Sequence, residues 1–167
     1  MAISPTLSSY LNQHSATYDL IPHPHTSSSM ETAEKAHVSG DRLAKAVIVR
    51  DEDRYIMIVV PSSEHIDLAE LRHRFGHLVD IASEGELSRL FPDCTLGAVP
   101  PTGTAWGLET YVDERLIGPA EIYFEAGDHE ELVRVSGDEF EHLMEDASRG
   151  HFGHTTQRSS QLGTPDL

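Results

Sequence analysis

Two apolar segments separated by a short polar turn constrain the fold more than any other feature of this sequence. Residues 44–50 and 55–60 are rich in Val and Ile and flank the turn Asp51-Glu52-Asp53-Arg54. Their nearly continuous apolar character predicts two central strands of a sheet. Because such strands are buried on both sides, the rest of the chain has to cover both faces of this pair.

The remaining sequence mixes helical and strand patterns without the strict alternation of a βαβ protein. Ser or Asp followed three residues later by Glu is typical of a helix start. Helices are expected over 6–14, over 30–38 from Ser28 and Glu31, and after the pairs Asp67/Glu70, Ser83/Glu86 and Ser136/Glu139. Strands are expected around 18–22, 78–81, 109–113, 121–125 and 131–135. This pattern predicts a single α+β domain with a mixed sheet over residues 1–146, followed by a flexible polar tail over residues 147–167.

The charge balance limits the partners that the chain can bind. Its 167 residues carry a formal charge of −16, from 12 Lys and Arg against 28 Asp and Glu. Proteins that follow a nucleic-acid backbone need basic surfaces, because phosphate contacts supply most of their affinity. The acidity therefore argues against DNA binding and against wide RNA binding. It leaves open a contact with one end of a nucleic acid through a few residues.

Cysteine content and hydropathy indicate a cytoplasmic protein without a membrane partner. Cys94 is the single cysteine, so no disulfide can form within the chain, and we interpret it as a structural residue. No apolar run approaches the ~20 residues that a membrane-spanning helix needs.

A loop rich in Gly and Pro is the first candidate for a binding site. Residues Gly97 to Gly103 contain two Gly and two Pro, including Pro100 and Pro101, and also Thr102. Gly lets the backbone approach a ligand closely, whereas Pro fixes φ and removes an N–H. Such a loop is either a tight connector or a rigid cradle whose N–H groups bind a carbonyl oxygen or orient a water.

Lys45 is the second candidate. It lies between Ala44 and Ala46 at the start of an apolar strand, and only one other lysine, Lys35, occurs in the chain. One interpretation is a strand-end lysine whose ammonium reaches solvent. The other is a fixed cation that holds a phosphate, a carboxylate or a polarised carbonyl.

A turn at Gly127, Asp128 and His129 is the third candidate. Gly-Asp is a common turn pair, and the histidine can face a site as a hydrogen-bond donor or a proton shuttle. The pairs His23/His25 and His151/His154 raise the question of a metal, but neither has zinc-site spacing. We therefore expect no metal. A P-loop and a Gly-x-Ser-x-Gly nucleophile elbow are also absent from the sequence.

These features together resemble the YbaK / prolyl-tRNA-synthetase-associated domain family, which edits mischarged aminoacyl-tRNA. The resemblance runs over roughly residues 6–145 and keeps the family's order of motifs. The matching segments are His23-Pro24, Ala44-Lys45, Val59-Val60-Pro61, residues 81–87, the Gly97–Pro101 loop, Val112-Asp113 and Ala126-Gly127. The family fold is a partly barrel-like sheet flanked by helices.

The resemblance implies hydrolysis of the ester between a small wrong amino acid and the 3′ end of a tRNA, often tRNA(Pro), without cofactor or metal. It implies a catalytic role for Lys45, Gly97 and Pro101, and the turn described above adds His129 as a fourth catalytic candidate. Lys45 would contact the terminal adenosine, and the Gly97–Pro101 loop would hold the aminoacyl carbonyl and place the water. Substrate-binding residues are expected at His25, Thr26, Met30, Ala46, Pro100, Thr102, Gly103, Gly127 and Asp128.

Two departures from the family pattern concern specificity. Many relatives have a polar residue at the position of Ala46 and a Gly-Ser turn where this chain has Gly127-Asp128.

A non-catalytic binding module of the same fold, associated with a synthetase, is one alternative function. A metal-dependent hydrolase that uses His23, His25 and His129 is the other.

Overall fold

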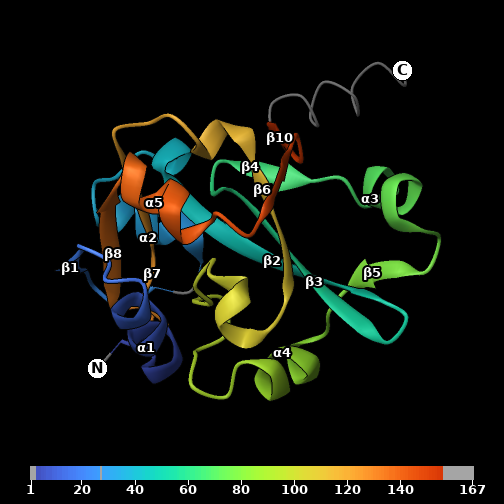
Figure 1. Ribbon diagram of the computed structural model, residues 1–167, viewed down its shortest axis with the longest axis horizontal. Coiled ribbons are helices and arrows are strands. Elements are labelled where there is room, and N and C mark those ends of the chain that lie inside the picture. The colour runs from blue at the N-terminus through green and yellow to red at the C-terminus, as the bar shows by residue number, and fades with distance from the viewer. Residues whose placement is uncertain (1–2, 27, 156–167) are drawn as a thin grey trace.

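A mixed sheet of eight strands forms the centre of the molecule (Figure 1), as seen in a computed structural model that describes residues 3–26 and 28–155. The main path of the sheet has the order β1 (Asp19–Pro22), β8 (Glu131–Ser136), β7 (Glu121–Glu125), β2 (Leu43–Asp51), β3 (Arg54–Pro61), β6 (Glu109–Asp113), β9 (Ser148–Gly150). A short strand, β5 (Val79–Ile81), also pairs with β2, and β4 (Glu64–Ile66) pairs separately with β10 (Gly153–Thr155). The α+β class with a mixed sheet, expected from the sequence, is confirmed.

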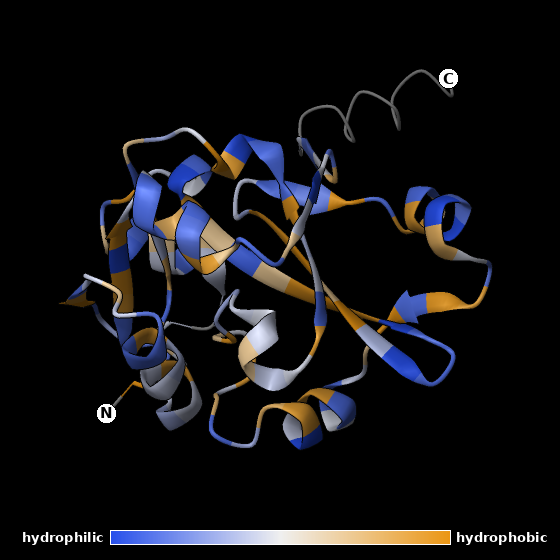
Figure 2. Ribbon diagram, in the orientation of Figure 1, coloured by the Kyte–Doolittle hydropathy of each residue, from blue (hydrophilic) through white to orange (hydrophobic). Residues whose placement is uncertain are grey.

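The hairpin of β2 and β3 occupies the middle of this sheet, as its apolar sequence predicts. The two strands pair antiparallel from Ala44 opposite Pro61 to Asp51 opposite Arg54. Strand β7 adds to β2 in parallel, and β6 adds to β3 in parallel. Apolar residues run along much of both strands (Figure 2).

Five α-helices and three short 3-10 helices accompany the strands in the described residues. The α-helices are α1 (Pro5–Gln13), α2 (Ser29–Lys35), α3 (Leu68–Phe75), α4 (Glu84–Leu90) and α5 (Gly137–Leu143). The 3-10 helices are η1 (Gly40–Arg42), η2 (Gly103–Trp106) and η3 (Glu114–Leu116). The expected N-caps form at Ser28, Asp67, Ser83 and Ser136, and Ser83 with Glu86 makes a complete capping box.

Alternation along β2 divides its side chains between two faces of the sheet. Ala44 and Ile48 face the larger core, which also contains residues of α1 and α5. Leu43 lies on the opposite face under α2, and Val49 lies on that face beside Leu71 of α3. Both faces of the central hairpin are therefore covered, and Lys45 belongs to the face of Leu43 and Val49.

The expected flexible tail is wrong for residues 148–155. These residues form β9 beside β6 and β10 beside β4, and Phe152 between them is buried. The fully buried carboxylate of Asp113 fixes this segment, because its Oδ2 atom accepts the N–H groups of Phe152 and Gly153 at 2.8 Å each. The polar composition of the segment conceals these long-range bonds. The remainder of the expected tail, residues 156–167, lies outside the described residues.

Candidate functional site

The Gly97–Gly103 loop combines an exposed start with a buried end. Gly97 has φ +83°, a left-handed conformation that glycine adopts without strain. Pro100 and Pro101 are buried. Gly103 lies so close to β6 that a Cβ there would come within 2.2 Å of Thr110 Oγ1, which accounts for the glycine at that position. Packing at one end therefore holds the loop, while Gly97 at the other end reaches the surface.

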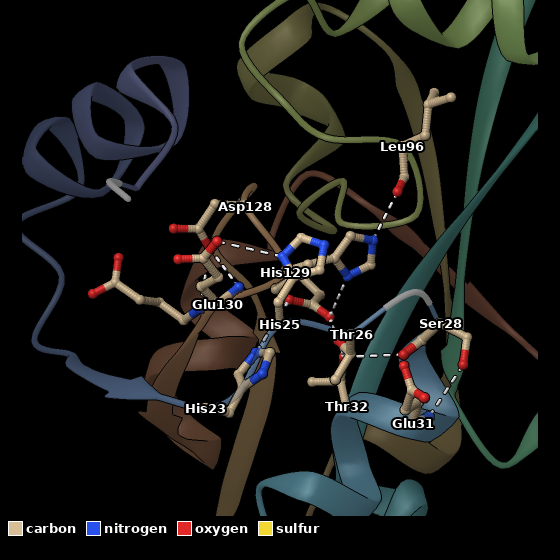
Figure 3. A network of polar contacts seen from close by, with 12 residues as sticks. His23, His25, Thr26, Ser28, Glu31, Thr32, Leu96, Asp128, His129 and Glu130 are labelled. Carbon is tan, nitrogen blue, oxygen red and sulfur yellow. Dashed lines mark hydrogen bonds and ion pairs between the residues drawn. The ribbon is translucent and has the colours of Figure 1, made fainter.

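Two hydrogen bonds join the residues just before this loop to the turn at residues 126–129, and Figure 3 shows the one between His129 and Leu96. The N–H of Thr95 donates to the carbonyl of Gly127 at 2.7 Å, and His129 Nε2 donates to the carbonyl of Leu96 at 2.7 Å. Leu96 directly precedes Gly97. The structure therefore brings two of the three sequence candidates together, and the histidine side chain sets the position of the loop.

The start of the loop offers backbone donors that have no acceptor among the described residues. Within residues 3–26 and 28–155, no acceptor hydrogen-bonds the N–H of Gly97 or of Val99. Neighbouring N–H groups on a fixed loop can stabilise the negative charge that develops on a carbonyl oxygen during acyl transfer. This geometry suits a substrate with a polarisable carbonyl.

A buried carboxylate lies behind the loop. Glu125 ends β7, and its Oε2 atom is 3.4 Å from His129 Nδ1 and accepts a hydrogen bond from Thr32 Oγ1 at 2.7 Å. The other oxygen, Oε1, is 3.7 Å from His23 Nε2. The contact with Glu125, opposed by burial and aided by the Leu96 carbonyl, raises the pKa of His129 above its usual range. His129 is itself almost fully buried, so its side chain contacts the loop from the interior of the protein.

Three expected substrate-binding residues lie around α2. Thr26 is buried and shares a hydrogen bond with Thr32, which connects it to Glu125. His25 is exposed, lies 3.3 Å from Glu130 through Nδ1, and its ring meets the His129 ring edge-on. Met30 is half exposed, and its sulfur lies against Gly40. The segment from His25 to Met30 thus borders the polar cluster on one side and the surface on the other.

Lys45 is a half-buried cation that lacks a direct partner among the described residues. It forms no hydrogen bond or ion pair with any described residue. Burial lowers its pKa, although the charge of Glu64 partly opposes this effect. By strand alternation Lys45 lies on the same sheet face as Glu125 of neighbouring β7, whereas Ala46 points to the larger core.

The other expected binding residues make contacts that hold the loops. Asp128 Oδ1 accepts the N–H groups of Glu130 and Glu131, a typical turn arrangement. Gly127 has φ +114°, and a Cβ there would lie 3.0 Å from Ser4 Cβ. Thr102 is buried, and its hydroxyl has no partner in the described residues.

Sequence reasoning missed Glu125, Thr32 and the carbonyl of Leu96. The available signal for Glu125 was a carboxylate that ends an apolar strand just before the Ala126-Gly127 turn. No pattern in the sequence indicates that a histidine ring reaches the Leu96 carbonyl, because this contact spans 33 positions.

The structure does not gather His23, His25 and His129 into a group of metal ligands. Within the described residues, one set of three side chains brings ligand atoms close enough for a metal, namely Asp67, Glu70 and His154. Asp67 caps α3, Glu70 lies in α3 and His154 lies in β10, and none of them belongs to the candidate site. None of the helices in the described part of the chain has the length and apolar character needed to cross a bilayer.

A family model for the aminoacyl-tRNA editing domain matches residues 23–143, which include every expected catalytic and substrate-binding residue. The chain belongs to the aminoacyl-tRNA editing domain family. The resemblance seen in the sequence is therefore confirmed. Among curated proteins, none matches the chain significantly.

Solved structures share the fold of this editing domain. A candidate trans-editing enzyme for prolyl-tRNA synthetase aligns with TM-score 0.77 and 22% identity, over 92% of this chain and 99% of its own. A hypothetical protein aligns with TM-score 0.76 and 20% identity, over 89% and 99%. A scaffold protein used for computational epitope grafting aligns with TM-score 0.78 and 20% identity, over 90% and 97%. At these identities the likeness supports the fold.

Proposed function

We propose that this editing domain acts in trans as an aminoacyl-tRNA deacylase that removes a small wrong amino acid from tRNA(Pro). Membership of the editing family supports the substrate class. The structurally similar candidate trans-editing enzyme for prolyl-tRNA synthetase supports the choice of tRNA(Pro) and an association with that synthetase. The protein would act in the cytoplasm, where charged tRNA is used.

One observation carries the proposal: the start of the Gly97 loop presents N–H groups that have no acceptor among the described residues, and a buried histidine holds the loop from the interior side. In the proposed reaction, a water oxygen bonds to the aminoacyl carbonyl carbon and the bond to the ribose oxygen breaks. The products are a free amino acid and a tRNA with a free terminal hydroxyl. The N–H groups of Gly97 and Val99 stabilise the developing oxyanion.

The remaining candidates have supporting roles in this proposal. Lys45 supplies the cation for the terminal nucleotide, and Pro101 keeps the loop rigid. Thr26 and Met30, with His25, border the pocket for the amino-acid side chain. Because an ester hydrolyses readily in water, positioning and oxyanion stabilisation suffice without a covalent intermediate.

The test is deacylation of tRNA(Pro) charged with a panel of amino acids, by wild type, Lys45→Ala and Lys35→Ala, with and without a chelator. Lys35 is the other lysine, is exposed on α2, and provides a matched control. We expect release of one or two small amino acids, loss of this activity in Lys45→Ala alone, and no effect of the chelator. Binding of charged tRNA without any release would favour the non-catalytic module, and inhibition by the chelator would favour a metal enzyme.

A further inference from the structure

Buried polar atoms without partners concentrate behind the Gly97 loop. Within the described residues, six buried side-chain N or O atoms lack a hydrogen-bond partner. Four of them are His23 Nε2, Glu125 Oε1, Asp128 Oδ2 and His129 Nδ1. Buried polar groups are normally satisfied, so such a concentration in one place requires an explanation.

The hydrogen bonds to the backbone fix which ring nitrogens carry protons. A carbonyl can only accept, so His129 Nε2 donates to Leu96 and His23 Nδ1 donates to Pro24 at 2.7 Å. If both rings were neutral, His129 Nδ1 and His23 Nε2 would each present a lone pair. These lone pairs would face the two oxygens of the Glu125 carboxylate, at 3.4 and 3.7 Å.

That arrangement is electrostatically unfavourable unless the cluster holds an additional proton. Thr32 contributes only one hydroxyl proton, and it can donate this proton either to Glu125 or to the Ser28 carbonyl. An additional proton on either ring converts a repulsive contact into a charge-assisted one. His129 is the nearer of the two rings to Glu125, at 3.4 Å against 3.7 Å for His23, and this contact raises the pKa of His129, so we place the additional proton on His129.

We propose that Glu125 is a positioning residue of the editing site, which forms with His23 and His129 a buried proton-sharing cluster that holds the Gly97–Pro101 loop through the Leu96 carbonyl. This inference rests on the proposed function and extends it to residues that do not touch the substrate. A protonated His129 donates a stronger hydrogen bond to Leu96 than a neutral one does. Because a displacement of about 1 Å can cost roughly 100-fold in rate, this bond influences catalysis.

The groups that face His129 come from three segments. Glu125 faces it from β7, Asp128 from its own turn, and His25 from the segment after β1. His23, in the same segment, lies at the other oxygen of Glu125. His25 is in turn paired with Glu130. Of these groups, Glu125 makes the closest contact with the free ring nitrogen of His129.

The matched variants for the test are Glu125→Gln and Glu121→Gln. Both residues lie on β7 and the substitution is the same, but Glu121 is near Arg134 at the surface, away from the cluster. Single-turnover deacylation is measured from acidic to alkaline pH with tRNA(Pro) charged with the amino acid that wild type releases. The ring nitrogens of His129 and His23 are followed by NMR over the same pH range, with His129→Gln used for assignment.

We expect wild-type His129 to be doubly protonated at neutral pH and to lose its proton at lower pH in Glu125→Gln. At neutral pH kcat should fall about tenfold in Glu125→Gln with KM unchanged, and acidification should restore part of it. Glu121→Gln should match wild type throughout. A passive structural role would not produce recovery at low pH.

An unchanged titration of His129 in Glu125→Gln, or a kcat equal to that of Glu121→Gln at every pH, would overturn the inference. The wild-type ring spectrum is a test that does not need a folded variant, because two neutral rings at neutral pH would also overturn it. If wild type released no amino acid, the proposed function would fail. The NMR titration would then still decide whether the cluster shares a proton.

Discussion

Glu86 and Glu125 are two buried carboxylates that the protein treats in opposite ways. Glu86 Oε1 accepts the Ser83 N–H at 2.8 Å, and its Oε2 accepts the hydroxyl of Tyr55 at 2.6 Å and Arg50 Nη1 at 3.1 Å. Glu125 receives one hydroxyl from Thr32, and one of its oxygens has no hydrogen-bond partner in the described residues. Both residues are less than a tenth exposed.

The difference separates a structural carboxylate from one that is connected to a candidate site. Donors around Glu86, first among them the Ser83 N–H, lower its pKa to about 2, so it stays ionised and caps α4. Glu125 faces two histidine rings, and the other nitrogen of each ring donates a hydrogen bond to a backbone carbonyl. A buried carboxylate whose two oxygens both accept hydrogen bonds keeps one protonation state. A buried carboxylate with an oxygen that lacks a donor can share a proton with the rings beside it.

Replacing each of the two carboxylates by alanine should give the largest difference between them in activity and stability. Glu125→Ala should lower deacylation about 100-fold, because the Gly97 loop loses its support. Glu86→Ala should lower the melting temperature and leave the rate per folded molecule unchanged. Rates normalised by the folded fraction from circular dichroism test this prediction, and equal losses at both positions would contradict it.

Acid unfolding should reveal how much the ionised Glu86 carboxylate stabilises the folded protein. Its folded pKa of about 2 lies below its usual 4.5, so its stabilising contribution is present above pH 4.5 and is lost as the pH falls toward 2. In Glu86→Gln, stability should therefore depend less on pH over this range. Urea titrations at a series of acidic pH values measure the effect, and identical slopes in wild type and variant would contradict it.

A smaller effect of opposite sign is expected for His129. Its pKa is raised above 6.5 in the folded protein, so the contribution of its charged form is complete below pH 6.5 and is lost as the pH rises through the raised value. Stability should decline as the pH rises above 6.5 in wild type and decline less in Glu125→Gln. Thermal melts between neutral and alkaline pH test it, and a wild-type stability that rises with pH there would be inconsistent with the cluster.

The smallest effect of a substitution on activity is expected at Cys94, which lies close to Gly127 but outside the cluster of Glu125, His23 and His129. Burial raises the pKa of its thiol to about 12, so almost no thiolate is present at pH 8. Alkylation of the folded protein should be much slower than that of the urea-unfolded protein, and Cys94→Ala should retain full activity. Rapid alkylation of the native thiol would show that this region opens.

The sequence predicted the α-helices and most of the strands because their signals are local, but it did not predict β4, β9 or β10. The Val- and Ile-rich segments of β2 and β3 and the Ser83/Glu86 cap each depend on residues within a few positions of one another. The tail was misjudged because Phe152 and the Asp113 carboxylate meet only in three dimensions. Local composition carries no information about such a bond.

The candidate site was predictable in part for the same reason. The Gly97–Gly103 loop and the Gly127 turn stand out in sequence, and the structure joins them through Thr95 and His129. The role of Glu125 was not predictable, since an acidic residue at a strand end is most often solvent-exposed. Only its burial beside two histidines distinguishes it.

The most direct test of the editing account compares Gly97→Ala with Gly107→Ala. Both glycines have left-handed φ, +83° and +72°, so alanine should cost each about 1–2 kcal/mol of stability. A Cβ at Gly107 would meet nothing within 4 Å. The account predicts that Gly97→Ala loses deacylation of charged tRNA(Pro) while Gly107→Ala, with similar loss of stability, keeps it. Equal activity of the two variants would contradict a catalytic role for the Gly97 loop.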